Sequence, residues 1–144
     1  MHPNLTIFYA DDDAEDLYFF SEVVNTMNGV SLHTVDHGNA LIEALHNPPP
    51  TPNIIFLDLN MPGKNGFEVL RELRDSQDFR DIPVVIFSTS SDEKTIFKTH
   101  ELGATFYLPK QENYESFKKS IQYTLSIDWK SFQPTRENFL YSAA

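Results

Sequence analysis

The chain has 144 residues, of which 40% are hydrophobic and 13% aromatic, so it is long and apolar enough for one domain with one core and too apolar for a disordered protein. Its 21 acidic and 11 basic residues give a net charge of −10, which disfavours binding to nucleic-acid phosphates or anionic lipids and suits a basic partner or a cation site. The absence of cysteine excludes disulfides, thiolate metal sites and cysteine nucleophiles.

The sequence carries no sign of a membrane span or a secretion signal. Its longest apolar runs are far shorter than the roughly 20 residues that cross a bilayer. The N-terminus, from Met1 to Asn4, lacks a basic stretch followed by an apolar one. We therefore expect a soluble, cytoplasmic, single-domain protein.

Five short segments rich in β-branched and aromatic residues are predicted to form strands. Most are apolar nearly throughout, which is typical of strands covered on both faces. The segments are Leu5–Ala10, Val30–Val35, Asn53–Leu57, Val84–Phe87 and Thr105–Leu108.

Segments with helical spacing of apolar residues follow each strand. Of these, Ser91–Glu101 is the most polar, and we expect a weakly anchored helix there. The proline run Pro48–Pro52 is predicted to be a stiff loop. The predicted helices cover Ala14–Met27, Asn39–His46, a stretch after Gly66, Ser91–Glu101 and Glu112–Leu125.

Strand and helix alternate five times along the chain. Parallel strands need crossover connections, which are right-handed almost without exception. The pattern therefore predicts an α/β protein with a doubly wound, five-stranded parallel sheet and helices on both faces. In such sheets the ligand site lies beyond the carboxyl ends of the strands.

Polar residues follow four of the predicted strands at that point. Asp11 and Asp12 come after the first strand, Asp58 after the third, Ser88 after the fourth and Lys110 after the fifth. Each alone has an ordinary explanation, such as a helix cap or a solvated loop residue. Together, at one edge of the sheet, the carboxylates would repel one another unless a cation or a raised pKa relieved them. Oxygen ligands in a shallow cleft favour Mg²⁺.

Taken in this order, these residues resemble the receiver domain of two-component response regulators, with the flavodoxin-like strand order 2-1-3-4-5. The resemblance covers about residues 4–126 and is most specific in the segment from Asp58 to Gly66, which reads Asp-Leu-Asn-Met-Pro-Gly-x-x-Gly. It implies a receiver domain over residues 1–126 and a short extension over 127–144 that packs on the same domain.

The resemblance also implies roles for individual residues. Asp58 would be the phosphoacceptor, and Mg²⁺ would be held by Asp11, Asp12, Asp58 and the backbone carbonyl of Asn60. Ser88 and Lys110 would bind the phosphoryl group. Tyr107 would turn inward on activation, so that phosphorylation switches an interaction face made by helix 4, strand 5 and helix 5.

Three positions depart from the commonest pattern of the family or add to it. Ser88 is smaller than Thr, which is the frequent residue at this position in the family. Gln111, rather than proline, follows Lys110, which leaves the isomer of that peptide bond open. Asp13 adds a third acid to the first loop, and we expect it to cap the first helix.

These features predict a stand-alone response regulator that is phosphorylated by a histidine kinase or a histidine phosphotransfer protein and acts on a downstream protein. It would not be an enzyme beyond self-catalysed phosphotransfer and dephosphorylation. We expect no nucleic-acid or membrane partner, because no segment long enough for a DNA-binding domain follows residue 126. The protein would be a monomer or a phosphorylation-dependent dimer.

Two other functions compete with this one. A haloacid dehalogenase-type aspartate phosphatase also uses Asp and Mg²⁺, but it needs a second Asp two residues after the nucleophile, where Asn60 stands. A degenerate receiver would only bind partners. The aromatic extension is also open to two interpretations: it folds back on its own domain, which we favour, or it forms a dimer or partner contact through Trp129, Phe132 and Phe139.

Overall fold

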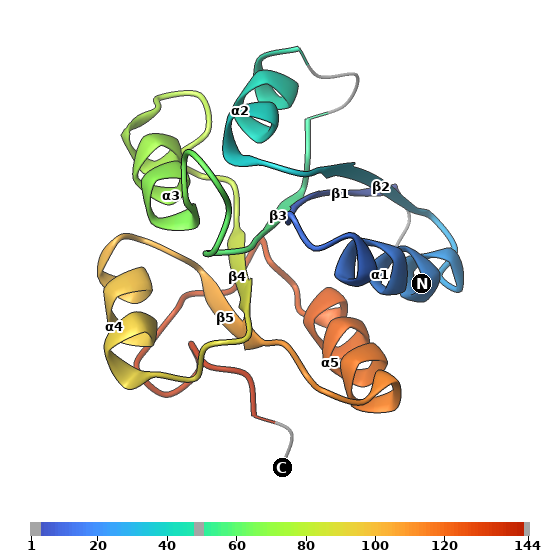
Figure 1. The fold of residues 1–144 in the computed structure, drawn as a ribbon. Coiled ribbons are helices and arrows are strands. Elements are labelled where there is room, and N and C mark those ends of the chain that lie inside the picture. Colours follow the sequence, from blue (N-terminus) through green and yellow to red (C-terminus); the bar gives the residue numbers. More distant parts are fainter. Residues whose placement is uncertain (1–3, 48–50, 143–144) are drawn as a thin grey trace.

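The computed structural model describes residues 4–47 and 51–142 and has five strands and five helices that alternate along the chain (Figure 1). The strands are β1 (Leu5–Ala10), β2 (Val30–Val35), β3 (Ile54–Leu57), β4 (Val84–Ser88) and β5 (Phe106–Pro109). The helices are α1 (Ala14–Asn25), α2 (Gly38–His46), α3 (Gly66–Asp75), α4 (Glu93–Glu101) and α5 (Tyr114–Ser126). Most of the predicted Pro48–Pro52 loop lies outside the described residues.

All five strands are parallel and lie in the order β2-β1-β3-β4-β5, which confirms the predicted fold. The bounds of three strands differ from the prediction by one residue, and β5 begins at Phe106 rather than at Thr105. Asn53 lies before β3, because its side chain accepts a hydrogen bond from the Thr6 amide at 2.7 Å instead of continuing the strand. Ser88 and Pro109 pair with each other and extend β4 and β5 by one residue toward the carboxyl edge.

Helices cover both faces of the sheet, as the apolar strands require (Figure 1). Successive side chains of β1 point to opposite faces: Ile7 and Tyr9 pack with α1 and α5, whereas Phe8 and Ala10 pack with α2 and α3. Both layers are closely filled, so the strand ends are fixed relative to one another. Within the described part of the chain, no helix is long and apolar enough to cross a membrane.

Helix α4 is the most loosely attached of the helices. Thr99 is its one buried residue, and Phe97 is 60% exposed. The side chain of its N-cap residue, Asp92, makes no capping hydrogen bond. Because few apolar contacts hold it, this helix can shift at lower cost than the others.

The extension after α5 wraps around β5. Its first part packs on the face shared with α5, where the rings of Trp129 and Phe132 lie 5.8 and 6.0 Å from that of Phe106. The Trp129 indole N–H also donates to the carbonyl of Thr124 near the end of α5, at 3.1 Å. The extension is therefore fixed to the domain close to where it begins.

The later part of the extension lies along the outer edge of β5 and against α4 (Figure 1). The Tyr107 amide donates to the Phe139 carbonyl at 2.8 Å, and the Tyr141 amide donates to the Tyr107 carbonyl at 2.9 Å. The Phe139 ring is 3% exposed and stacks on His100 of α4, with centroids 4.5 Å apart. These contacts join the extension to both β5 and α4.

We expect Phe139→Ala to lower the stability of the protein substantially, because it would empty a buried site between β5 and α4. Truncation of a buried Phe typically costs about 3–5 kcal/mol, which corresponds to a fall in melting temperature on the order of 10 °C. Thermal unfolding measures this, and Phe97→Ala, at an exposed position of α4, is the matched control with an expected loss below about 1 kcal/mol. Equal losses in the two variants, or a change in oligomer size without loss of stability, would contradict the packing described here.

Candidate functional site

The loop after β1 is organised by two aspartates. Asp11 is fully buried: its Oδ1 accepts the Asp13 amide at 2.9 Å, and its Oδ2 accepts the Tyr9 hydroxyl at 2.5 Å. Asp13 caps α1, where its side chain accepts the amides of Glu15 and Asp16 at 2.9 and 3.2 Å. Both oxygens of Asp11 thus have protein partners, and its position is fixed.

The loop after β3 carries Asp58 at the same edge of the sheet. The Asp58 amide donates to the Ala10 carbonyl of β1 at 3.0 Å, which places the residue beside the β1 loop. Helix α3 starts directly against this segment, since a Cβ on Gly66 would lie only 2.4 Å from the Asp58 carbonyl oxygen. Only glycine leaves room for this close approach, so Gly66 supports the shape of the Asp58 loop.

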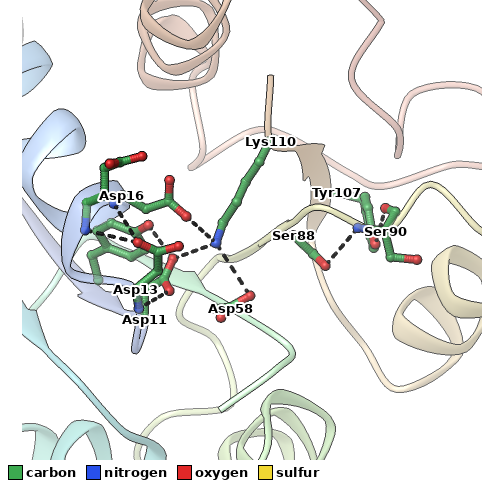
Figure 2. Close-up of polar contacts among 10 residues, drawn as sticks. Asp11, Asp13, Asp16, Asp58, Ser88, Ser90, Tyr107 and Lys110 are labelled. Carbon is green, nitrogen blue, oxygen red and sulfur yellow. Dashed lines mark hydrogen bonds and ion pairs between the residues drawn. The ribbon is translucent and has the colours of Figure 1, made fainter. Parts of the chain in front are cut away.

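Lys110 brings a buried ammonium group into the site. Its amide donates to the Ser88 carbonyl at 2.8 Å, and its side chain is 8% exposed. The Nζ atom lies 2.8 Å from an oxygen of Asp11 and 2.8 Å from one of Asp16, but 3.7 Å from Asp58 Oδ1 (Figure 2). Lys110 is therefore hydrogen-bonded to two carboxylates and faces the third at a longer distance.

The environment of Asp58 favours its protonated form. Burial, followed by the negative charge of Asp11, raises the pKa of Asp58 to about 7, although Lys110 acts in the opposite direction. For Lys110, burial alone would lower the pKa, but its hydrogen bonds to Asp11 and Asp16 raise it above its ordinary value. The ammonium is thus charged at neutral pH, and the carboxyl of Asp58 lacks sufficient positive charge around it.

A cation shared by three carboxylates would supply the positive charge that Asp58 lacks. Asp11, Asp12 and Asp58 each offer one oxygen, and these oxygens lie within 4.8 Å of one another. Asp12 is exposed, which leaves one side of the group open to water. An all-oxygen set with room for several waters fits Mg²⁺. Asn60, in the same loop as Asp58, is exposed, and a backbone hydrogen bond from it lowers the pKa of Asp58.

Ser88 and Tyr107 form a second group at the edge of this site. The buried Ser88 hydroxyl accepts the Ser90 amide at 3.2 Å, and the Tyr107 hydroxyl donates to the Ser90 carbonyl at 2.8 Å (Figure 2). Tyr107 is fully buried, and burial raises the pKa of its hydroxyl. Its ring already occupies an inward position, the one that the resemblance associates with activation.

Two further residues, Tyr9 and Asp16, belong to the site although the sequence pattern does not mark them as functional. Tyr9 precedes Asp11 by two residues, so the alternation of side chains along a strand places both on one face. This alternation alone is enough to predict that Tyr9 lies beside Asp11. Asp16 bonds a lysine 94 residues away, and no local pattern indicates that contact. The peptide bond between Lys110 and Gln111, whose isomer the sequence left open, is trans.

The fold and this group of side chains define a class of protein. The family model described as the response regulator receiver domain matches residues 7–122, and the chain belongs to this family. It is 33% identical over 133 residues to the response regulator Rcp1 of Synechocystis sp., covering 84% of this chain and 86% of Rcp1. It also matches the DNA-binding transcriptional regulator NtrC of Klebsiella pneumoniae, at 30% identity over 69% of this chain but only 20% of NtrC.

Solved structures agree with this assignment. The crystal structure of the Mn²⁺-bound form of response regulator Rcp1 superposes with a TM-score of 0.80 at 31% identity, over 91% of this chain and 99% of that one. The phosphorylated cyanobacterial phytochrome response regulator RcpA also gives a TM-score of 0.80, at 28% identity over 93% of this chain and 98% of that one.

Membership of the family establishes the general activity of the chain. Receiver domains are signalling modules rather than true enzymes, and histidine kinases or phosphotransfer proteins phosphorylate them. They bind a divalent cation through an acidic cluster such as Asp11, Asp12 and Asp58. The alternative of a haloacid dehalogenase-type phosphatase does not agree with this membership.

Proposed function

We propose that the chain acts as a single-domain response regulator whose phosphoacceptor is Asp58. The observation that carries this proposal is the convergence of the Asp58 carboxylate with two further carboxylates and the Lys110 ammonium at one edge of the sheet. Similarity to Rcp1 over 86% of that protein's length supports the single-domain interpretation. In this proposal residues 1–126 are the receiver domain and residues 127–144 are an extension packed on it.

In this proposal Asp58 acts as the nucleophile. One of its carboxylate oxygens attacks the phosphorus of a phosphohistidine, so that a P–O bond forms while the P–N bond breaks and the imidazole leaves. Phosphoryl transfer depends mainly on positioning and charge neutralisation. Lys110 offsets the negative charge that gathers at Asp58. Asp11, Asp12, Asp58 and the Asn60 carbonyl would hold Mg²⁺, which would supply further positive charge when bound.

Ser88 and Tyr107 pass the change at Asp58 to the surface. The Ser88 hydroxyl, which accepts a hydrogen bond from the Ser90 amide, can move away from that amide and donate its own hydrogen to an oxygen of the phosphoryl group. That movement alters the loop to which the Tyr107 hydroxyl is bonded. The loosely held α4 follows this loop, so its position responds to phosphorylation. The switched face is α4, β5 and α5, and residues 139–141 of the extension form part of it.

The proposed partners follow from these roles. A sensor histidine kinase or a histidine phosphotransfer protein supplies the phosphoryl group in the cytoplasm, and a downstream protein reads the α4–β5–α5 face. The net charge of −10 argues against nucleic-acid or membrane partners. The protein acts as a monomer or as a dimer that forms on phosphorylation.

Intact mass tests the proposal directly. We expect the protein, incubated with Mg²⁺ and a small acyl phosphate, to gain the mass of one phosphoryl group, and we expect peptide mapping to place it on Asp58. Chelation of divalent cations by EDTA should abolish the gain, because the crowded carboxylates then lack their cation. A protein that gains no mass and binds no beryllofluoride would instead be a degenerate receiver that only binds partners.

A further inference from the structure

We propose that Asp16 is a positioning residue that holds the ammonium of Lys110 toward α1 and competes for it with the group bound at Asp58. This inference rests on the proposed function, because it assigns Asp16 a part in the same phosphorylation site. The effect is to make Asp58 a weaker acceptor of anionic groups than the site would be without Asp16.

The distances around Lys110 support this competition. Its Nζ lies 2.8 Å from Asp16 Oδ2 and 2.8 Å from Asp11 Oδ2, which is the length of a charge-assisted hydrogen bond. The distance to Asp58 Oδ1 is 3.7 Å, too long for a hydrogen bond. Figure 2 shows the ammonium between these carboxylates, with its two short contacts on the side of the β1 loop and α1.

The two carboxylates that bond Lys110 differ in how firmly they are held. Asp11 is fully buried and accepts hydrogen bonds from Tyr9 and from the Asp13 amide as well as from Lys110. Asp16 lies in the first turn of α1 with 20% of its side chain exposed. Water can replace Lys110 at Asp16 more easily than at Asp11, so the Asp16 pair is the one that opens when Lys110 moves.

Binding of a phosphoryl group at Asp58 adds negative charge on the far side of Lys110. The ammonium must then approach that group, and its bond to Asp16 opposes the movement. Asp16 also contributes its own negative charge to a cleft that an anionic donor has to enter. Both effects have the same sign, so neutralising Asp16 favours anions at Asp58.

Asp16→Asn tests the inference, with Glu15→Gln as the matched control. The two substitutions remove the same charge from the same helical turn, but Glu15 is exposed and is not among the hydrogen-bond or ion-pair partners of Lys110 in the described part of the chain. We measure the affinity for beryllofluoride in the presence of Mg²⁺ and the rate of phosphoryl incorporation from a small acyl phosphate. For Asp16→Asn we expect both to rise by roughly 3- to 10-fold, and for Glu15→Gln by less than about 2-fold.

Two further variants separate positioning from a purely structural effect. Asp16→Glu keeps the charge and is expected to remain within about 2-fold of the parent protein. In a Lys110→Met background, Asp16→Asn should lose the part of its effect that acts through the ammonium and keep only the smaller part that comes from its own charge. Urea unfolding of each variant establishes that the comparison is made between folded proteins.

The outcomes distinguish this inference from the proposed function. If the parent protein binds beryllofluoride and Asp16→Asn gives no gain, or if Glu15→Gln gives the same gain, the inference is overturned and the proposed function stands. An undiminished effect of Asp16→Asn in the Lys110→Met background also overturns it. If the parent protein neither binds beryllofluoride nor accepts a phosphoryl group, the proposed function fails and this inference fails with it.

Discussion

Asp58→Asn is expected to abolish both phosphorylation and the binding of beryllofluoride. The amide keeps the size of the side chain but cannot act as the oxygen nucleophile, and no other carboxylate in the site has the same surroundings. Asp11 has both oxygens occupied by Tyr9, Lys110 and the Asp13 amide. We therefore expect loss of the mass gain to below the detection limit, measured on the intact protein after incubation with Mg²⁺ and a small acyl phosphate.

Asp78→Asn is the control for this experiment, because it makes the same chemical change at an exposed position in the segment that leads into β4, at the amino end of that strand. It should be phosphorylated like the parent protein. If Asp58→Asn still gained the mass of a phosphoryl group, the acceptor would be another residue, and the assignment of Asp58 would be wrong.

Without divalent cations, the protein is expected to lose stability as the pH rises from about 4 to 7, because of Asp58. Burial and then Asp11 raise the pKa of Asp58 from 3.8 to about 7. Between these values the folded chain keeps a proton that the unfolded chain has released, so the free energy of unfolding falls with rising pH. A shift of this size corresponds to a loss of up to about 4 kcal/mol, complete above pH 7.

Urea unfolding at pH 5 and pH 8 in the presence of EDTA measures this effect. Asp58→Asn cannot titrate, so it should be more stable than the parent protein at pH 8 and should lack this part of the pH dependence. Asp78→Asn should follow the parent curve. Added Mg²⁺ should recover much of the loss in the parent protein, because it binds the folded state. Parallel curves for the parent and Asp58→Asn would show that the Asp58 carboxyl is not destabilised in the folded protein.

The sequence predicted most of the fold because the strands are apolar on both faces and the helices between them are amphipathic. The same rules placed Asp11, Asp58 and Lys110 at one edge, since each directly follows a parallel strand. Errors were confined to strand and helix ends, where single side chains decide the boundary. Asn53, for example, bonds the Thr6 amide with its side chain instead of entering β3.

Other features depend on the three-dimensional path of the chain. The contact between Asp16 and Lys110 requires the first turn of α1 to face the loop after β5, which no local pattern specifies. The inward position of Tyr107 depends on the carbonyl direction at Ser90. The sequence also does not determine whether the extension packs on its own domain, because aromatic residues such as Trp129 and Phe139 could be buried equally well against another molecule.

The pairing of the extension with β5 has a consequence for how the protein behaves at high concentration. An edge strand with free amides and carbonyls is a template onto which a strand of another molecule can add. Tyr107 uses both its amide and its carbonyl in bonds to residues 139 and 141 of its own chain. The extension therefore acts as a cap that blocks sheet-to-sheet aggregation along β5.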